Sequence, residues 1–598
     1  MQKKMRKSDS IFLIAVIACL ILHCLCIFTP LPYNDEALYP TVPFRFINGD
    51  IMLQHEWHTT QFSSVFQHLP VLFWLTFKGS TEGILLFLRI LYLIIHTLST
   101  FIIYKFFRNY KLWAVAASML FYTQVSYRML TISYATMITL FLLLFSLCLL
   151  RFHKKRTSAY LVFAGVCFGA CCVCNPLYCI LYPIYVVACI KSNRKLKHNI
   201  YCEQDIQTAD TIPQKFHPCK NCSAFFELNS FVLVSVGIGI MAVICIIYFL
   251  STGGSFTTIP NDIKNLFSAT EYDIIVSVKD KFSLTTRLFN EISLNMPFLL
   301  PSLYIMLLLD KNRNNNAHKI AYLILSLSFV FLYIYGITSV FLKGEENAFA
   351  VPLPLTVFST VCYILTKKKN QLLFYCMWCP GMVGAFIQYL TSNTNLTAFS
   401  LTLVVANIAG VIFIKDFFAE LCDDLKLKSK KQIKTYSIIL CLAICSQLIF
   451  NCFLYQYDRI PNKEEYTQVT YGPLAHFYLN DSYYESYTNS LSDLDIIKSR
   501  CQENDPVLIT SRMGWMYLYV DQPIAAYSTC LLTLDADLLN SYYAQNPDKM
   551  PKYIYVGFAD TYYKPDRDAA FKKVSILEKM FNCTKEELSM GVLLTVNT

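Results

Sequence analysis

The sequence predicts a polytopic α-helical membrane protein with about 13 transmembrane helices and a small extracytoplasmic α/β C-terminal domain. The chain has 598 residues, of which 55% are hydrophobic and only 15% charged. Apolar runs of about 17–22 residues recur as far as Phe453, and such a run crosses roughly 30 Å of hydrocarbon. Because lipid offers the backbone no hydrogen-bond partners, these runs should be helices. Beyond residue 455 charges become frequent and apolar runs short, which indicates a separate domain.

The first apolar run follows four basic residues, as a signal peptide would. Its length and the lack of a small-residue cleavage site favour a retained helix. We place the expected spans at 11–29, 82–104, 112–128, 132–150, 158–174, 176–191, 229–250, 293–309, 320–341, 350–365, 371–391, 396–414 and 435–455.

The basic residues set the predicted orientation. With a cytoplasmic N-terminus, every cluster falls on the cytoplasmic side, as the positive-inside rule requires. These clusters lie at 105–111, 151–156, 191–197, 311–319, 367–369 and 426–434. The net charge of +10 is thus explained without nucleic acid as a partner. We expect a multi-pass protein of the plasma membrane whose C-terminal domain is extracytoplasmic.

This topology divides the chain into a transmembrane domain, 1–455, and an extracytoplasmic domain, 456–598. Two further outward segments are long, the first outer loop at 30–81 and a loop at 251–292. In the C-terminal domain, apolar β-rich runs at 507–510, 553–556 and 591–596 predict strands. Helical spacing covers 482–503, 535–546 and 567–581. Alternating helices and strands predict an α/β fold.

Cysteines give no sign of a disulfide framework. The chain has 24, many of them inside apolar runs, where they act as small hydrophobes. The cytoplasmic loop 192–228 contains Cys202, His217, Cys219 and Cys222, a set that could bind zinc. A second Cys-x2-Cys is missing from it, which favours free cytosolic thiols.

The first outer loop holds the most chemistry. Asp35 and Glu36 follow the first apolar run on a turn rich in proline and tyrosine. A carboxylate at the membrane face is well placed to take a proton from a substrate that stays in the bilayer. Farther along, Phe44, Phe46 and Ile47, and then Val65 and Phe66, predict short amphipathic helices on the membrane surface.

The first outer loop combines the Asp35-Glu36 pair, Ala37-x-Tyr39, an aromatic residue before Asn48-Gly-Asp50, and a proline before the next span. With these features it resembles the first extracytoplasmic loop of GT-C glycosyltransferases. The branch it resembles is the glycosyltransferase 39/83 type, that of protein O-mannosyltransferases and lipid A aminoarabinose transferases. Gly79-Ser-Thr-Glu82 with Arg89, Ser133-Tyr134 and Asn175-Pro176 resemble the family in order.

The resemblance implies an integral-membrane glycosyltransferase that moves a hexosyl or pentosyl group from a polyprenyl-phosphate donor to an acceptor hydroxyl at the outer face. The acceptor would be a lipid, a glycan or a protein. Asp35 matches the family's general base, and Glu36 would orient it, contact the sugar or stay solvated. The leaving polyprenyl phosphate needs cationic or hydrogen-bonding stabilisation. Arg128, Lys343 and Tyr134 are the main candidates; Lys279, Lys281 and Arg287 also face outward, and Arg89 would be structural.

Whether the protein binds a divalent cation stays open. Some family members hold one with a glutamate late in this loop, where the present chain reads Gln67-His68-Leu69-Pro70. His55, Glu56 and His58 could substitute, because His-x2-His with a carboxylate suits zinc or manganese. A solvated cluster is the alternative.

Two other classes remain open on the sequence. One is a transporter or flippase for a lipid-linked glycan, which fits the number of spans, although polar residues gather in outward loops and not at the membrane midplane. The other is a polysaccharide ligase or polymerase, whose large functional loop usually comes late in the membrane portion.

Overall fold

A computed structural model describes residues 6–29, 35–124, 129–187, 228–269, 352–366, 370–391, 396–424, 466–511, 513–529, 531, 534–558 and 566–597. Three predicted spans, 293–309, 320–341 and 435–455, lie outside these residues. So do the zinc candidates of the 192–228 loop and the predicted domain boundary at 455/456.

Six described helices are long and apolar enough to cross a membrane, so the expected number of about thirteen is not confirmed. They are α1 (Lys7–Cys26), α4 (Ile84–Phe107), α6 (Tyr134–Lys155), α9 (Leu228–Ser251), the run of α16 (Gln371–Leu373), the π-helical turn η7 (Phe374–Trp378) and α17 (Cys379–Thr391), and α18 (Leu396–Asp424). Four other expected spans are shorter helices: α5 (Leu112–Thr123), α7 (Ala159–Cys174), the segment Pro176–Val187 that begins with η4 (Pro176–Ile180), and α15 (Pro352–Leu365).

Local structure marks where two of these helices end: α7 ends at the expected Cys174, whereas α5 ends at Thr123, before the expected residue 128. Helix α5 ends where Gln124 adopts extended backbone angles. Helix α7 ends before Asn175, also extended, because a residue that precedes proline disfavours the helical conformation. The Asn175 side chain then accepts a hydrogen bond from the Leu177 N–H and caps η4.

Helix α18 is the centre of the bundle, with 94% of its apolar window buried, and it packs on α5, α6, α15 and α17. Helices α7 and α9 cross most closely. A Cβ atom added to Gly165 would lie 2.0 Å from the Val234 carbonyl oxygen, and one on Gly237 would lie 2.0 Å from the Val162 oxygen. Small residues at such a crossing let two membrane helices approach closely and gain dispersion contacts.

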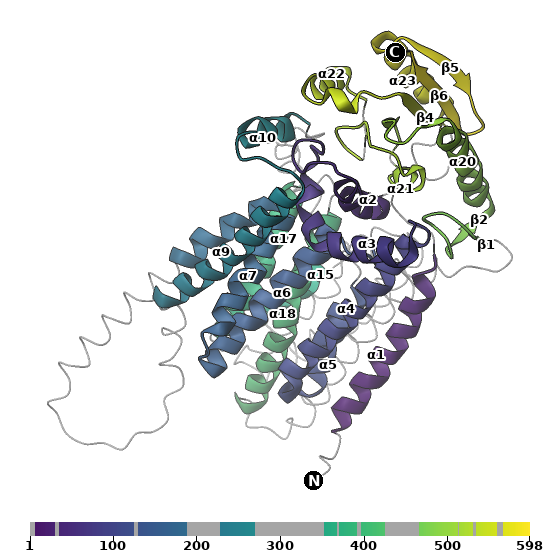
Figure 1. Cartoon of the computed structure of the whole chain (residues 1–598). Coiled ribbons are helices and arrows are strands. Elements are labelled where there is room, and N and C mark those ends of the chain that lie inside the picture. The colour runs from purple at the N-terminus through teal and green to yellow at the C-terminus, as the bar shows by residue number, and fades with distance from the viewer. Residues whose placement is uncertain are drawn as a thin grey trace, which may run out of the picture.

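An outer layer lies across one end of the bundle (Figure 1). It comprises α2 (Asp35–Ile47), η1 (Thr59–Ser63), α3 (Ser64–Lys78) and α10 (Ile259–Ser268). The N-terminus lies at the opposite end (Figure 1). The first outer loop therefore does form short helices. Phe44 and Phe46 of α2 are nevertheless buried in protein, so α2 does not lie exposed on a membrane surface as expected, whereas α3 exposes Leu69, Phe73 and Phe77.

The C-terminal region sits above this layer (Figure 1) and contains a four-stranded sheet with helices. The strand order is β3-β4-β6-β5, with β3 parallel to β4 and the other pairs antiparallel. The strands are β3 (Val507–Ile509), β4 (Tyr553–Gly557), β5 (Cys583–Glu587) and β6 (Gly591–Val596); the helices are α20 (Asp481–Arg500), α21 (Trp515–Val520), α22 (Ala536–Gln545), η8 (Pro547–Lys549) and α23 (Arg567–Met580). The predicted elements are thus present, and β5 with the pair β1 (Tyr466–Gln468) and β2 (Tyr478–Asn480) adds to them.

The C-terminal region is attached to several outer helix ends. The Tyr478 N–H donates to the Phe28 carbonyl, just past α1, at 2.8 Å. At the start of α4, the Gly83 N–H donates to the Gly472 carbonyl at 3.1 Å. Asn265 of α10 donates to Gln545 of α22 at 2.6 Å. Backbone and side-chain bonds therefore join this region to the outer ends of α1 and α4 and to α10.

Candidate active site

The turn that carries the acidic pair is the first turn of α2. Asp35 opens the helix, and its side chain lies outside the part of the structure that is described. Glu36 is described, and it is only 1% exposed. The alternative that Glu36 stays solvated is therefore wrong.

Glu36 is paired with Arg89 of α4. The Arg89 Nε donates to Glu36 Oε2 at 3.1 Å, and a second guanidinium nitrogen contacts the same oxygen. Arg89 also donates to the carbonyls of Ile27 and Thr29 at 2.7 and 2.8 Å. The other carboxylate oxygen, Oε1, accepts the Leu130 N–H at 3.0 Å. One buried ion pair thus ties the ends of α1 and α4 and the approach to α6 to the start of α2.

Tyr134 lies close to the same turn of α2. It is the first residue of α6, behind a Ser133 capping box in which Ser133 and Thr136 satisfy each other's backbone N–H groups. Its ring lies 5.9 Å from that of Tyr39, in an edge-on arrangement. Tyr39 stands four residues after Asp35, so the two share a helix face. The structure therefore brings the Asp35 turn and Tyr134 to one place.

Other phosphate candidates lie outside the described residues. These are Arg128, Lys343, Lys279, Lys281 and Arg287. Leu130, which bonds Glu36, follows Arg128 by two positions in the sequence.

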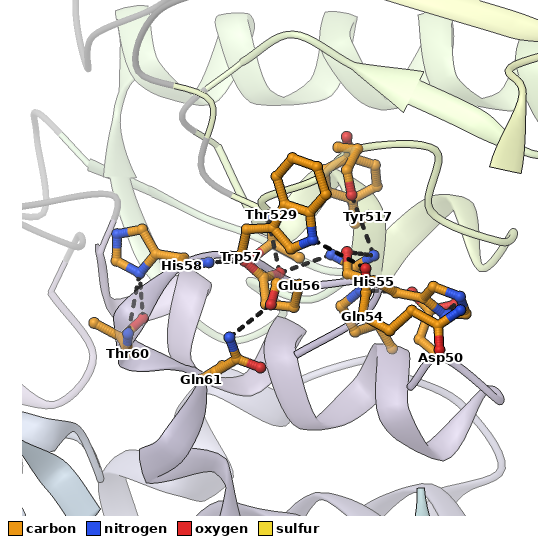
Figure 2. A network of polar contacts seen from close by, with 12 residues as sticks. Asp50, Gln54, His55, Glu56, Trp57, His58, Thr60, Gln61, Tyr517 and Thr529 are labelled. Atoms are coloured by element: carbon orange, nitrogen blue, oxygen red, sulfur yellow. Dashed lines mark hydrogen bonds and ion pairs between the residues drawn. The ribbon is translucent and has the colours of Figure 1, made fainter. Parts of the chain in front are cut away.

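The set His55, Glu56 and His58 does not form a metal site, because both Glu56 oxygens and the Nδ1 atom of each histidine are bonded to protein groups (Figure 2). Glu56 Oε2 accepts from Arg45 at 2.7 Å and from the Thr529 N–H at 3.2 Å, and Oε1 accepts the His58 N–H. His55 Nδ1 accepts the Ile51 N–H, and His58 Nδ1 bonds Thr60. Among the described residues, no three His, Cys, Asp or Glu side chains could hold a metal ion.

Burial shapes the protonation of this network. Burial raises the pKa of Glu56, and Arg45 opposes that rise. Burial alone would also raise the pKa of Asp50, but Arg45 and Lys549 hold it below its usual range. For His58, burial lowers the pKa to about 4, so this imidazole is neutral near pH 7. His55 and Glu56 are buried and His58 is half-buried, so the trio is not a solvated cluster.

An apolar groove of about 610 Å³ runs beside α7, the segment Pro176–Val187 and α9. Its upper end is formed by Met52, Phe62 and Val65 of the first outer loop. The polar groups in it are mostly satisfied internally: Tyr182 bonds Ser235, and the Tyr248 hydroxyl bonds Ser64 and His68, both at 3.2 Å. A groove of this size lined by carbon and sulfur suits a hydrocarbon chain.

Among the comparisons with known proteins, only the one with solved structures gives matches. No family model matches the chain, and no curated protein does. The chain is similar to the archaeal oligosaccharyltransferase AglB from Archaeoglobus fulgidus, solved with an inhibitory peptide and a dolichol-phosphate. The match covers 92% of this chain and 69% of that one at 13% identity, with a TM-score of 0.43. A second structure of the oligosaccharyltransferase from this organism, tethered with an acceptor peptide, matches 93% of this chain and 69% of its own at 12% identity and the same TM-score.

Sequence reasoning missed the groove and Gln67. The groove has a sequence signal, since α7 is rich in alanine, glycine and cysteine, and Gly169 and Cys172 of this helix line the groove together with Ala242 and Cys245 of α9. Gln67 of α3 is 1% exposed, and neither end of its carboxamide has a hydrogen-bond partner among the described residues.

Proposed function

We propose that this protein is an integral-membrane glycosyltransferase that moves a sugar from a polyprenyl-phosphate donor to an acceptor hydroxyl at the extracytoplasmic face. The observation that carries the proposal is the apolar groove whose upper end is built from the same outer loop that contains Asp35 and Glu36. A lipid chain in the groove would bring its phosphate-sugar head to the level of that loop.

Asp35 is proposed as the general base. A hydroxyl is a weak nucleophile, so a carboxylate must remove its proton as the oxygen attacks C1 of the sugar. The new C1–O bond forms, the bond from C1 to the phosphate oxygen breaks, and its electron pair leaves with the polyprenyl phosphate. Glu36 does not touch the substrate in this scheme, because Arg89 and the Leu130 N–H occupy it. Its role is to hold the first turn of α2.

The leaving phosphate would be stabilised near Tyr134, with Arg128 and Lys343 as the proposed cations. Tyr134 stands at the N-terminus of α6, whose dipole favours a nearby anion. No step is routed through a metal ion, since both carboxylate oxygens of Glu56 and the Nδ1 atoms of His55 and His58 are bonded within the protein.

The acceptor is a hydroxyl of a lipid, a glycan or a protein. The transferred sugar is a hexosyl or a pentosyl group. A flippase for a lipid-linked glycan is the second candidate, because a groove along the bundle would also suit a lipid that crosses the membrane. The two differ in chemistry: only the transferase breaks the bond to phosphate.

The proposal is tested in cells by mass spectrometry of surface glycans and glycoproteins. Cells that lack the gene are complemented with wild type, Asp35→Asn or Glu82→Gln. Glu82 is the matched control, an outer-loop carboxylate in a part-exposed pair with Lys78. We expect wild type and Glu82→Gln to restore one glycan, and Asp35→Asn to reduce it by about 10²–10⁴-fold at equal protein level. Full restoration by Asp35→Asn would remove Asp35 from the mechanism.

A further inference from the structure

The buried charge cluster between α2 and the C-terminal region consists of Arg45, Asp50, Glu56 and Lys549. Two cations face two carboxylates, so the cluster is neutral as a whole. Arg45 and Glu56 have fully enclosed side chains, and Asp50 is only 4% exposed. Charges are costly to take out of water, and the cost is recovered only where partners and geometry are good.

Arg45 uses its guanidinium to join three segments. Its Nε donates to Asp50 at 2.5 Å and its Nη1 to Glu56 at 2.7 Å. Its Nη2 donates to the carbonyl of His55 at 2.7 Å and to that of Ala526, in the C-terminal region, at 3.2 Å. This fork of donors on a rigid plane cannot be reproduced by lysine, whose ammonium is a single point.

The partners of Arg45 continue the connection into the C-terminal region. Glu56 accepts the N–H of Thr529, 473 residues away (Figure 2). Asp50 accepts from Lys549 at 2.5 Å. Around them, the Trp57 N–H donates to the Tyr527 carbonyl at 2.7 Å, and the Trp57 ring lies 5.3 Å from that of Tyr542.

The C-terminal region also contacts α2 nearer to the start of the helix. The Thr41 hydroxyl donates to the Gly514 carbonyl at 3.0 Å. A Cβ atom on Gly514 would lie 3.2 Å from the Leu38 backbone, so the loop before α21 lies directly against α2. The C-terminal region therefore contacts α2 both at the Arg45 end and one turn from the acidic pair.

We propose that Arg45 is a positioning residue: it locks α2 against the C-terminal region and so fixes where the acidic turn of α2 stands. The catalytic part of this proposal rests on the proposed function. The docking of α2 against the C-terminal region through Arg45 does not depend on it. A misplacement of the base by about 1 Å costs roughly 10²-fold in rate, so loss of the lock reduces turnover more than donor affinity.

The test compares Arg45→Lys, Lys549→Met and Arg500→Gln in the full-length protein in nanodiscs. Arg45→Lys keeps the charge and loses the fork. Lys549→Met removes the partner at the edge of the cluster and is the milder variant if Arg45→Lys folds poorly. Arg500→Gln is the matched control, because it breaks a part-exposed ion pair with Glu586 on the same C-terminal region.

Two readouts are taken: hydrogen exchange of residues 35–47, and kcat and KM for the polyprenyl-phosphate sugar. Arg45→Lys is expected to speed exchange in α2 and lower kcat by about tenfold or more, with KM within about threefold. Lys549→Met should do the same to a smaller extent, and Arg500→Gln should change neither the exchange rate nor kcat by more than about twofold.

Unchanged exchange in α2 overturns the docking role, and an unchanged kcat per folded molecule overturns the positioning role. If wild type transfers no sugar, the proposed function fails, and the exchange result alone still supports or overturns the lock.

Discussion

At the scale of single residues, the acidic pair divides into two roles. Glu36 is held by Arg89 and by the Leu130 N–H, and both partners would be left buried if its charge were removed. Asp35 stands beside it, at the position proposed for the base. Substitution of Glu36 should therefore lower stability, whereas substitution of Asp35 should lower turnover.

Glu36→Gln is expected to destabilise the protein by about 3 kcal/mol, because removal of one partner of a buried ion pair leaves the other charge uncompensated. Thermal unfolding of the purified protein measures this, with Glu82→Gln as the control of unchanged stability. Asp35→Asn should melt like wild type and lose turnover. If Glu36→Gln melted like wild type, the pair with Arg89 would not hold the turn.

His58 gives the outer layer a pH dependence whose sign follows from its pKa. Burial lowers this pKa from 6.5 to about 4. The unfolded chain therefore binds a proton between these values and the folded chain does not, so stability falls as pH drops from about 6.5 to about 4. The loss should be on the order of 2 kcal/mol, below the full shift because His58 is only partly buried.

Unfolding midpoints at pH 7 and pH 4.5 check this expectation. His58→Gln should remove part of the decrease, whereas His476→Gln, which changes an exposed histidine of the C-terminal region, should leave it. An equal decrease in wild type and His58→Gln would assign the pH dependence to other groups.

At the scale of elements, the groove beside α7 and α9 makes a prediction about the donor. Ala242 lines the groove, and its neighbour Val243 is 54% exposed and is not part of the lining. Ala242→Trp should fill part of the groove and raise the KM for the polyprenyl-phosphate sugar by about tenfold, the equivalent of about 1.4 kcal/mol of lost binding. Val243→Trp is the matched control. Equal KM values for the two variants would place the lipid chain elsewhere.

The crossing of α7 and α9 makes a prediction about stability. Gly165 leaves no room for a side chain, whereas a Cβ atom on Gly239 of α9 would meet nothing within 4 Å. Gly165→Leu should force the helices apart and cost about 3 kcal/mol or more, as overpacking of a close contact does. Gly239→Leu should be nearly neutral. The yield of folded protein and its unfolding midpoint after purification separate the two variants.

Elements with a strong local pattern were predicted well from sequence. The strands at 507–509, 553–557 and 591–596 and the helices α20, α22 and α23 follow from buried β-rich runs and helical spacing. The bounds of α7 and α15 agree with the expected spans to within two residues, because the Asn175-Pro176 step marks the end of α7. The end of α5 was not predicted, because an apolar run sets hydropathy and not the residue at which a helix ends: α5 ends at Thr123, before the expected residue 128.

The candidate site was predicted in part, for reasons that are also physical. Tyr134 was expected only as a phosphate candidate, which stays a prediction; its contact with Tyr39 of α2 was not foreseen, and neither were the partners of Glu56. Thr529 is 473 residues from Glu56, and such a contact leaves no local periodicity. His55, Glu56 and His58 therefore resembled a metal set, although Arg45 occupies the carboxylate that would have bound the ion.

At the scale of the whole molecule, the structure gathers the first outer loop, α10 and the C-terminal region at one end of the helical bundle, away from the N-terminus (Figure 1). That arrangement agrees with the sidedness expected from the basic clusters, which stays a prediction. The apolar groove reaches the first outer loop at Met52, Phe62 and Val65, and the acidic turn belongs to the same loop. Under the proposed function, a lipid-borne substrate would therefore reach the base without crossing the membrane.

The most direct test of this account is the release of polyprenyl phosphate by the purified protein. Wild type and Asp35→Asn, reconstituted in nanodiscs, are supplied with a panel of radiolabelled polyprenyl-phosphate sugars and cell-envelope acceptors. The account predicts that wild type releases free polyprenyl phosphate from at least one donor while label appears in an acceptor, and that Asp35→Asn binds this donor without releasing it. Movement of intact donors between the two leaflets of a vesicle, with no release from any of them, would contradict it and identify a flippase.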